Sequence, residues 1–486
     1  MSVIRQRFAR IANDQPDRPV IFSGTNDVLT ASELWRSHLD LQQRLSAIGV
    51  GPNQLVMSAA GNRREALPLL LACLSLGAPL MPVDAGATMT ELAGFAERFG
   101  ASAVVLPDAA AAAYSPRSVH LSGDLHVAHH RLAGVDGLDY RGAALLKLTS
   151  GSTGLPKATL ATEAQLVADG EHIIAAMGIE SADVQIAAIP LSHSYGFGNI
   201  IMPLLLQGTA CVLRESFVPQ QVLADARRFQ ARVFAGVPYM FNYFCANPPA
   251  DGWPSCLQLL ISAGARLEPQ TAEAFGAQFG RKIHSFYGAS ETGGITYDAG
   301  DVPNEAGHVG GAMPGVTITL KEDEDAPAGS GRVFVRSGSV ASGYLHPQND
   351  PEGPFVDGGF LTGDYGSIDA HGCITLTGRA STAVNVAGRK VHPAEVERVL
   401  RTMECVQEAC VIAAPDDRRG QQIVAFVVNR QDASAQEVRR FCAARLAAYK
   451  VPRAIIFLPS LPLTARGKTD RARLLALALE QFEDSV

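Results

Sequence analysis

The chain has 486 residues, of which 47% are apolar and 18% are charged, and its formal net charge is -7. At about 150 residues per domain, this length indicates a globular protein of roughly three modules with large apolar cores. The acidic balance and the scattered basic residues argue against nucleic acid as the main partner, so small-molecule chemistry is the first hypothesis.

The first residues lack the long apolar run and small-residue cleavage site of a secretory signal. Ile4, Phe8 and Ile11 instead predict an amphipathic helix with these side chains facing inward, and a transit peptide is the alternative interpretation. Proline and glycine interrupt the uncharged run 66–83, which therefore predicts a buried helix ending near Gly77 and a short strand, with no integral membrane segment. Eight singly spaced cysteines predict reduced thiols in a cytoplasmic protein.

Apolar runs rich in valine, isoleucine, leucine and alanine alternate with helical patterns along the first half of the chain. They are 54–58, 103–106, 144–149, 185–189, 209–213, 233–237 and 257–262. This alternation predicts an α/β domain of mostly parallel sheets covered by helices. Thr162 and Gln165 form a capping-box pattern for a helix that we expect to end at Met177, before Gly178.

From about residue 307 the sequence changes to short alternating strands with turns rich in glycine and aspartate, which predicts an antiparallel, barrel-like subdomain over 307–379. A unit of domain size follows, with strand and helix patterns that include a capping box at Ser434 and Glu437. We therefore expect a large N-terminal domain over 1–379 and a small, mobile α+β domain over 380–486.

The first candidate site is the loop LTSGSTGLPKAT, residues 148–159. Backbone N–H groups around Gly151 and Gly154 can form a concave anion site, and hydroxyl side chains surround it. The spacing matches neither a Walker phosphate loop nor the G-x-S-x-G elbow of serine hydrolases. A plain turn between two strands is the alternative interpretation.

Two further segments carry residue types suited to a nucleotide. In HSFYGASETGG, residues 284–294, Tyr287 offers a flat face for a base and Gly288 lets that base approach the backbone. Glu291 supplies the hard oxygen that magnesium prefers. In LTGDYG and LTGR, Asp364 can bind ribose hydroxyls with support from Arg379.

Two more segments present residues that would act on the reacting groups. Lys468, in LPLTARGKTDR, is suited to neutralise charge on a transferring carboxylate or phosphate, although an exposed turn lysine is the commoner situation. PLSHSYGFG, residues 190–198, places His193 and Tyr195 in an apolar loop, where a satisfied, half-buried histidine is the simpler interpretation.

In this order, the segments resemble the adenylate-forming superfamily. That superfamily includes acyl-CoA synthetases, aryl-CoA ligases, adenylation domains of peptide synthetases and beetle luciferases. GHVGGAMPG and GRASTAVNVAGRKVHPAEVE extend the resemblance, as do the opening helices and strands, so that it covers nearly the whole chain. The resemblance implies that ATP activates a carboxylic acid to acyl-AMP with release of pyrophosphate, and that a thiol then displaces AMP.

The resemblance also implies a role for each matching residue. It implies an ATP site formed by Thr149, Ser150, Gly151, Ser152, Thr153, Gly154, Lys157, Gly264, Ala265, Tyr287, Gly288, Ala289, Ser290, Glu291, Asp364 and Arg379. It implies an acyl pocket lined by His193, Tyr195, Gly196, Gly264 and Gly288. Mg²⁺ would bind at Thr153 and Glu291, and Lys468 would bridge the carboxylate and the α-phosphate, with His193 and Arg379 also counted as catalytic.

The chain departs from the family pattern at the hinge. In the family the small domain rotates after adenylation, as hinged domains commonly do. The pivot position is usually Asp or Lys and is Ser381 here, which leaves open where and how fast the hinge moves.

The substrate follows less directly from the sequence. Amino-acid-activating relatives carry an Asp in the segment equivalent to SHSYGFG, and this chain has none there. Since an unpaired buried ammonium is costly, we expect an uncharged acid, preferably a fatty acid, with an aryl acid as the alternative. CoA is the expected acceptor and a carrier-protein phosphopantetheine the competitor. A catalytically inactive relative is the remaining, less favoured hypothesis.

Overall fold

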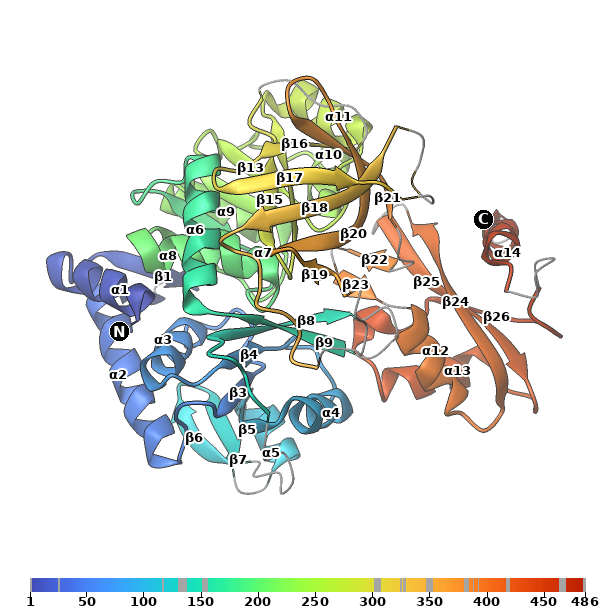
Figure 1. The fold of residues 1–486 in the computed structure, drawn as a ribbon, viewed down its shortest axis with the longest axis horizontal. Helices are drawn as coiled ribbons and strands as arrows, with labels where there is room; N and C mark the ends of the chain where they lie inside the picture. The colour runs from blue at the N-terminus through green and yellow to red at the C-terminus, as the bar shows by residue number, and fades with distance from the viewer. Residues whose placement is uncertain are drawn as a thin grey trace. The chain divides into compact units, whose positions relative to one another are not determined.

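The computed structural model describes the chain in ranges separated by short gaps. The described residues are 2–24, 27–115, 118–129, 138–150, 156–300, 307–323, 326, 329–346, 353–379, 384–387, 389–391, 393–416, 420–462 and 469–483. Contacts group the chain into two compact units (Figure 1). The large unit comprises residues 1–85, 94–149 and 158–379, and the small unit comprises residues 86–93, 150–157 and 380–486.

One sheet is built mainly from the first third of the chain. Its strands are β3 (Leu55–Ser58), β4 (Leu80–Pro82), β5 (Ala101–Pro107), β6 (Val119–Ser122), β7 (Leu125–His129), β8 (Leu145–Ser150) and β9 (Pro156–Ala161). They follow the order β6-β7-β5-β3-β4-β8-β9. β3 runs parallel to β4 and β5, and β4 to β8, as expected for strands with apolar side chains on both faces.

A longer sheet forms most of the rest of the large unit. Its strands are β1 (Pro19–Ser23), β2 (Asp27–Thr30), β10 (Val184–Ala187), β11 (Ala210–Leu213), β12 (Val233–Gly236), β13 (Leu259–Ser262), β14 (Ile283–Ala289), β15 (Gly293–Tyr297), β16 (His308–Ala312), β17 (Val316–Lys321), β18 (Gly331–Ser337), β19 (Phe355–Val356), β20 (Gly359–Ile368) and β21 (Cys373–Arg379). The order is β17-β18-β20-β21-β16-β15-β14-β13-β12-β10-β11-β1-β2, with β19 beside β20. Pairing is parallel from β1 to β14, through β11, β10, β12 and β13. It becomes antiparallel at β15, so the antiparallel strands continue the parallel sheet.

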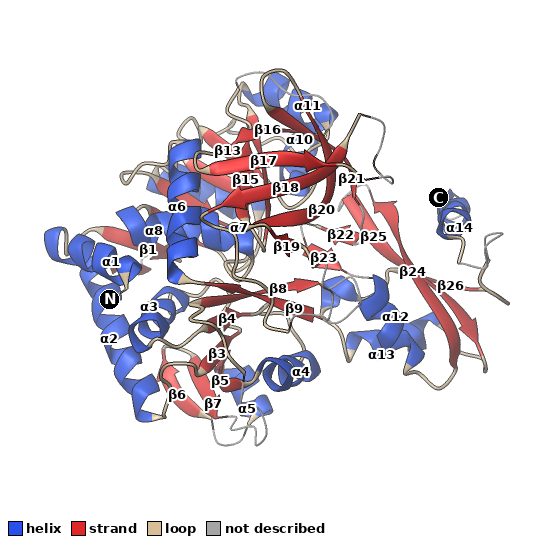
Figure 2. Ribbon diagram, viewed as in Figure 1, coloured by secondary structure: helices blue, strands red, loops and turns tan. Residues whose placement is uncertain are grey.

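Helices flank both sheets (Figure 2). They are α1 (Val3–Asp14), α2 (Ala31–Ala47), α3 (Ala66–Leu76), α4 (Met89–Phe99), α5 (Asp108–Tyr114), α6 (Glu163–Met177), α7 (Ser194–Gly196), the π-helix η1 (Phe197–Ile201), α8 (Met202–Gln207), α9 (Pro219–Phe229), α10 (Pro238–Ala246) and α11 (Pro269–Phe279). The predicted capping box is confirmed, because Thr162 and Gln165 exchange both hydrogen bonds and α6 ends at Met177. Gly178 follows with φ 60°, a conformation that glycine adopts at little cost.

The predicted first helix is confirmed with one change. In α1, Ile4 and Phe8 are buried, but Ala12 is the third fully buried residue and Ile11 is only partly buried. α3 ends before Gly77, and the short strand β4 follows, as predicted. No helix within the described ranges is both long and apolar enough to cross a membrane.

All eight cysteines are free thiols, and four of them are buried. Burial raises the pKa of Cys73 and Cys211 to about 12, and that of Cys410 and Cys442 to about 11. Because the thiolate is the reactive form, these four side chains act as apolar packing groups near neutral pH.

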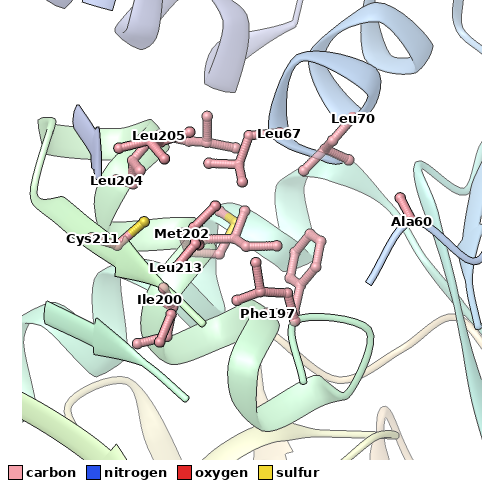
Figure 3. Packing of buried hydrophobic residues seen from close by; sticks show 14 of the residues in the cluster. Ala60, Leu67, Leu70, Phe197, Ile200, Met202, Leu204, Leu205, Cys211 and Leu213 are labelled. Atoms are coloured by element: carbon pink, nitrogen blue, oxygen red, sulfur yellow. The ribbon is translucent and has the colours of Figure 1, made fainter. Parts of the chain in front are cut away.

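The main hydrophobic core of the large unit joins α3, η1, α8 and β11 (Figure 3). Leu67 and Leu70 of α3, Phe197 of η1 and Met202 of α8 belong to it, and each is at most 2% exposed. The core thereby holds η1, which directly follows the segment PLSHSYG, against helix α3 and the strands beneath.

Leu67→Ala is expected to lower the free energy of unfolding by about 2–5 kcal/mol, because it deletes buried methyl groups and leaves a cavity. Leu39→Ala is the matched control, since Leu39 lies on α2 and is 42% exposed. Its effect is expected to stay within about 0.5 kcal/mol. Urea unfolding followed by circular dichroism measures both, and equal losses would contradict the core assignment.

The small unit contains most of the C-terminal elements. They are β22 (Val384–Val386), β23 (Arg389–Val391), α12 (Pro393–Arg401), β24 (Val406–Asp416), β25 (Gly420–Asn429), α13 (Ala435–Ala443), the 3₁₀ turn η2 (Ala448–Lys450), β26 (Ala454–Phe457) and α14 (Arg471–Glu483). β24 and β25 form a long antiparallel ladder, and β26 adds in parallel to β25. The capping box at Ser434 and Glu437 is confirmed. The small unit combines helices with this sheet, as predicted for an α+β domain, and it has its own apolar core.

Candidate active site

Several predicted site residues lie outside the described residues. They are Gly151, Ser152, Thr153, Gly154, Ser381 and Lys468. The side chains of Ser150 and Arg379 are likewise outside the description, although both backbones are described at strand ends. The geometry of the site therefore comes from the segments around β14, β20 and η1, all of which belong to the large unit.

A direct hydrogen bond joins two of the predicted site residues, Tyr287 and Asp364. The Tyr287 hydroxyl donates a hydrogen bond of 2.8 Å to Asp364 Oδ2, across 77 positions in sequence. Tyr287 lies near the end of β14 and Asp364 in β20, and both are at least nine-tenths buried. In the β20–β21 ladder Asp364 pairs with Arg379, so these two residues are neighbours in the backbone register. An aromatic ring, a carboxylate and the backbone of an arginine thus come together.

Glu291 lies in the turn between β14 and β15. Its Oε1 accepts a hydrogen bond of 2.8 Å from the hydroxyl of Tyr344, which itself forms an isolated bridge to Thr159 of β9. The turn backbone is held as well, because Ala341 N donates 2.8 Å to the Glu291 carbonyl. Burial, followed by the negative charge of Glu291, raises the pKa of Tyr344, so this hydroxyl stays a donor at neutral pH.

The segment PLSHSYGFG is tied to the same turn. Ser194 Oγ donates a hydrogen bond of 2.8 Å to Ser290 Oγ, and Tyr195 OH donates 3.1 Å to the Ile261 carbonyl. The Tyr195 ring lies 5.7 Å from that of Phe286. The chain then enters η1, and short π-helical turns of this kind are rare and often occur at functional sites.

His193 has an acidic neighbour that the sequence did not reveal. Its Nε2 lies 3.7 Å from Oδ2 of Asp84, a residue located two positions after β4. The His193 side chain is 39% exposed, whereas that of Asp84 is 14% exposed. SHSYGFG itself contains no aspartate, but the carboxylate of Asp84 lies beside this segment.

The glycines of this region serve packing. A Cβ at Gly198 would lie 2.9 Å from Ile173, and one at Gly294 would lie 2.8 Å from Met313. A Cβ at Gly236 would approach Phe241 to 3.2 Å, and one at Gly196 would collide with the Pro190 carbonyl. Their small size therefore does not indicate empty space for an acyl chain.

The remaining predicted residues occupy separate positions. Gly264 and Ala265 lie in an exposed turn after β13, Gly288 and Ala289 end β14, and Thr149 is half-buried near the end of β8. Lys157 is the second residue of β9 and groups with the small unit. Within the described residues, no group of three or more His, Cys, Asp or Glu side chains could hold a metal ion. Glu291 supplies a half-buried carboxylate that suits one ligand position.

Sequence reasoning missed Asp84, Tyr344, Lys147 and Asp169. Lys147 and Asp169 are both nearly buried, and Lys147 Nζ lies 4.0 Å from Asp169 Oδ2. A signal for Lys147 was present, because a lysine within the apolar strand ALLKLTS must find a partner when it is buried. No comparable local signal marks the other three, whose contacts depend on residues far away in sequence.

Two family models match the chain. The AMP-binding enzyme family matches residues 8–345, and the AMP-binding enzyme C-terminal domain matches residues 395–468. The chain is 30% identical to the long-chain-fatty-acid–CoA ligase of Bacillus subtilis (strain 168), over 68% of this chain and 61% of that protein. It is 29% identical to the feruloyl-CoA synthase of Amycolatopsis sp, over 90% of this chain and 92% of that protein.

A solved structure agrees in fold. It is an o-succinylbenzoate CoA synthetase from Bacillus subtilis, with a TM-score of 0.84 and 22% identity, covering 96% of this chain and 98% of that chain. At this identity the likeness shows the fold alone, a large N-terminal domain with mixed sheets and a small C-terminal domain. Since the family match spans well over half of the sequence, the chain belongs to the AMP-binding enzyme family and is an ATP-dependent, AMP-forming CoA ligase.

Proposed function

We propose that this enzyme activates a fatty acid with ATP to acyl-AMP and pyrophosphate and then transfers the acyl group to the thiol of CoA. The observation that carries the proposal is the 2.8 Å hydrogen bond between Tyr287 and Asp364. It places a flat aromatic group beside a carboxylate, which suits the base and the ribose hydroxyls of one nucleoside.

In the first half-reaction, a carboxylate oxygen of the acid attacks the α-phosphorus of ATP, and the bond to pyrophosphate breaks. Positioning and charge neutralisation supply most of such a rate. We assign nucleoside binding to Tyr287, Asp364 and Arg379, with Gly264, Ala265 and Gly288 near the base. We assign charge neutralisation to Lys468.

We assign the β- and γ-phosphates to residues 149–157, because this stretch of sequence is rich in hydroxyl residues and glycine. Thr153 and Glu291 would hold Mg²⁺, which would neutralise charge on the phosphate oxygens. Tyr344 orients the Glu291 carboxylate by donating to Oε1, so the second oxygen can serve as the ligand.

In the second half-reaction, the sulfur of CoA attacks the acyl carbon, the bond from that carbon to the phosphate oxygen breaks, and AMP leaves. We propose that the domain 380–486 pivots at Ser381 between the two steps, with a domain boundary after Arg379. His193 and Tyr195 border the acyl group in this proposal. The free thiols support a reducing, cytoplasmic location.

ATP–pyrophosphate exchange with a panel of acids tests the proposal. The panel contains saturated fatty acids of several lengths, benzoic and cinnamic acids, and amino acids, which Asp84 makes necessary. We expect the fastest exchange with a fatty acid, followed by thioester formation with CoA. Faster exchange with an aryl acid would identify the enzyme as an aryl-CoA ligase. Acyl transfer to a carrier-protein phosphopantetheine, and not to CoA, would identify the carrier protein as the acceptor. Absence of exchange with every acid would indicate an inactive relative.

A further inference from the structure

A buried ion pair lies where three of the site's segments meet. Lys147 is in β8, three residues before the end of that strand, and its side chain is 7% exposed. Its Nζ lies 4.0 Å from Oδ2 of Asp169, a residue of α6 whose side chain is 4% exposed. Taking a charge out of water costs several kcal/mol per ion, so burying Lys147 and Asp169 is costlier than burying apolar side chains in their place.

Asp169 connects this pair to the turn that carries Glu291. Its Oδ1 accepts a hydrogen bond of 2.8 Å from the backbone N–H of Gly294, the second residue of β15. The carboxylate also fills the space beside Gly293, where a Cβ would collide with it. On its other side, a Cβ at Gly198 of η1 would lie 3.2 Å from Oδ2. The carboxylate therefore packs against β15 and η1 at positions that have no side chain.

The charge of Lys147 also reaches Glu291. Burial lowers the pKa of Lys147, and the negative charges of Asp169 and Glu291 oppose that change. Removing the Lys147 ammonium would leave Asp169 as an uncompensated buried charge that is hydrogen-bonded to the backbone N–H of Gly294.

We propose that Lys147 and Asp169 form a positioning pair that fixes the backbone after Glu291, so that Glu291 meets the phosphate end of ATP correctly. This inference rests on the proposed role of Glu291. It predicts that breaking the pair weakens the binding of ATP more than the binding of the acid, because the pair contacts the segment after Glu291 and belongs in part to strand β8.

The same hairpin offers a matched control. Lys282 and Asp298 lie at the open end of the β14–β15 hairpin, with Nζ 2.8 Å from Oδ2 and side chains 11% and 4% exposed. Glu291 lies at the opposite end, where Ala289 pairs with Gly293. Lys282→Met thus breaks a buried pair in the same hairpin without changing charge beside Glu291.

The test compares Lys147→Met, Asp169→Asn, the double variant and Lys282→Met in the full-length enzyme. We measure the melting temperature, the Kd of ATP by calorimetry, and KM for ATP and for the acid in the exchange assay. Lys147→Met is expected to raise both Kd and KM for ATP about tenfold or more, with KM for the acid within about twofold. The double variant, which buries no unpaired charge, is expected to recover most of the ATP affinity. Lys282→Met is expected to lose thermal stability and to keep its ATP affinity.

Three outcomes would overturn the inference. They are an unchanged ATP affinity in Lys147→Met, an equal loss in Lys282→Met, or a double variant that binds ATP as weakly as the single one. If Lys147→Met does not fold, the double variant and Asp169→Asn still decide, because they differ in whether a charge is left unpaired. If the wild-type enzyme binds ATP but catalyses no exchange, the proposed function is refuted. The inference about Lys147 and Asp169 is still tested in that case, because the Kd of ATP can be compared between the variants. Wild-type enzyme that binds no ATP would refute both.

Discussion

Replacing Lys468 by alanine is expected to slow ATP–pyrophosphate exchange by about two to three orders of magnitude. The ammonium is assigned to the charge that develops between the attacking carboxylate and the α-phosphate, and no solvent group replaces a fixed cation there at the moment of reaction. The effect is expected in kcat more than in KM for ATP, because the interaction strengthens in the transition state.

The prediction is specific to one half-reaction. Lys468→Ala supplied with synthetic acyl-AMP is expected to form the thioester with CoA at nearly the wild-type rate, because the family resemblance implies that this lysine leaves the site before the second step. Arg473→Ala is the matched control, since it removes an exposed cation from α14 a few residues later. Exchange that stays within about threefold of wild type in Lys468→Ala would assign the charge neutralisation to another group.

Replacing Glu291 by glutamine is expected to lower kcat/KM for ATP about a hundredfold. The change keeps the shape and leaves an oxygen that can still accept from the Tyr344 hydroxyl, but it removes the charge that attracts a divalent cation. Raising the Mg²⁺ concentration is therefore expected to restore part of the rate. The measurement is the exchange rate as a function of both ATP and Mg²⁺.

Tyr344→Phe separates positioning from charge at the same carboxylate. It removes the 2.8 Å hydrogen bond to Glu291 while leaving the negative charge in place. A single hydrogen bond contributes about 1 kcal/mol, so the loss in kcat/KM is expected to stay near tenfold or below, with an unchanged Mg²⁺ dependence. If Glu291→Gln and Tyr344→Phe had equal effects and equal Mg²⁺ dependence, the metal role of Glu291 would be refuted.

Local patterns in the sequence were sufficient for most elements. The α6 boundaries followed from Thr162, Gln165 and Gly178, because a capping box and a left-handed C-terminal glycine act within four residues. The strands β3, β5 and β13 followed from short apolar runs, since a strand buried on both faces needs such a run. The family, too, was readable from ordered short motifs.

The contacts that assemble the site were decided by tertiary structure. The order of the strands brings Tyr287 to Asp364, places Asp84 beside His193, and sets Lys147 against Asp169. Each contact joins residues that are far apart in sequence, and its geometry depends on how β4, β8, β14 and β20 are arranged. A local pattern reports the preference of a few neighbouring residues, whereas a side-chain contact between distant segments exists only after the whole chain has packed. The sequence by itself thus determined which reaction class to expect, and the packing of the sheets determined which charged side chains surround the site.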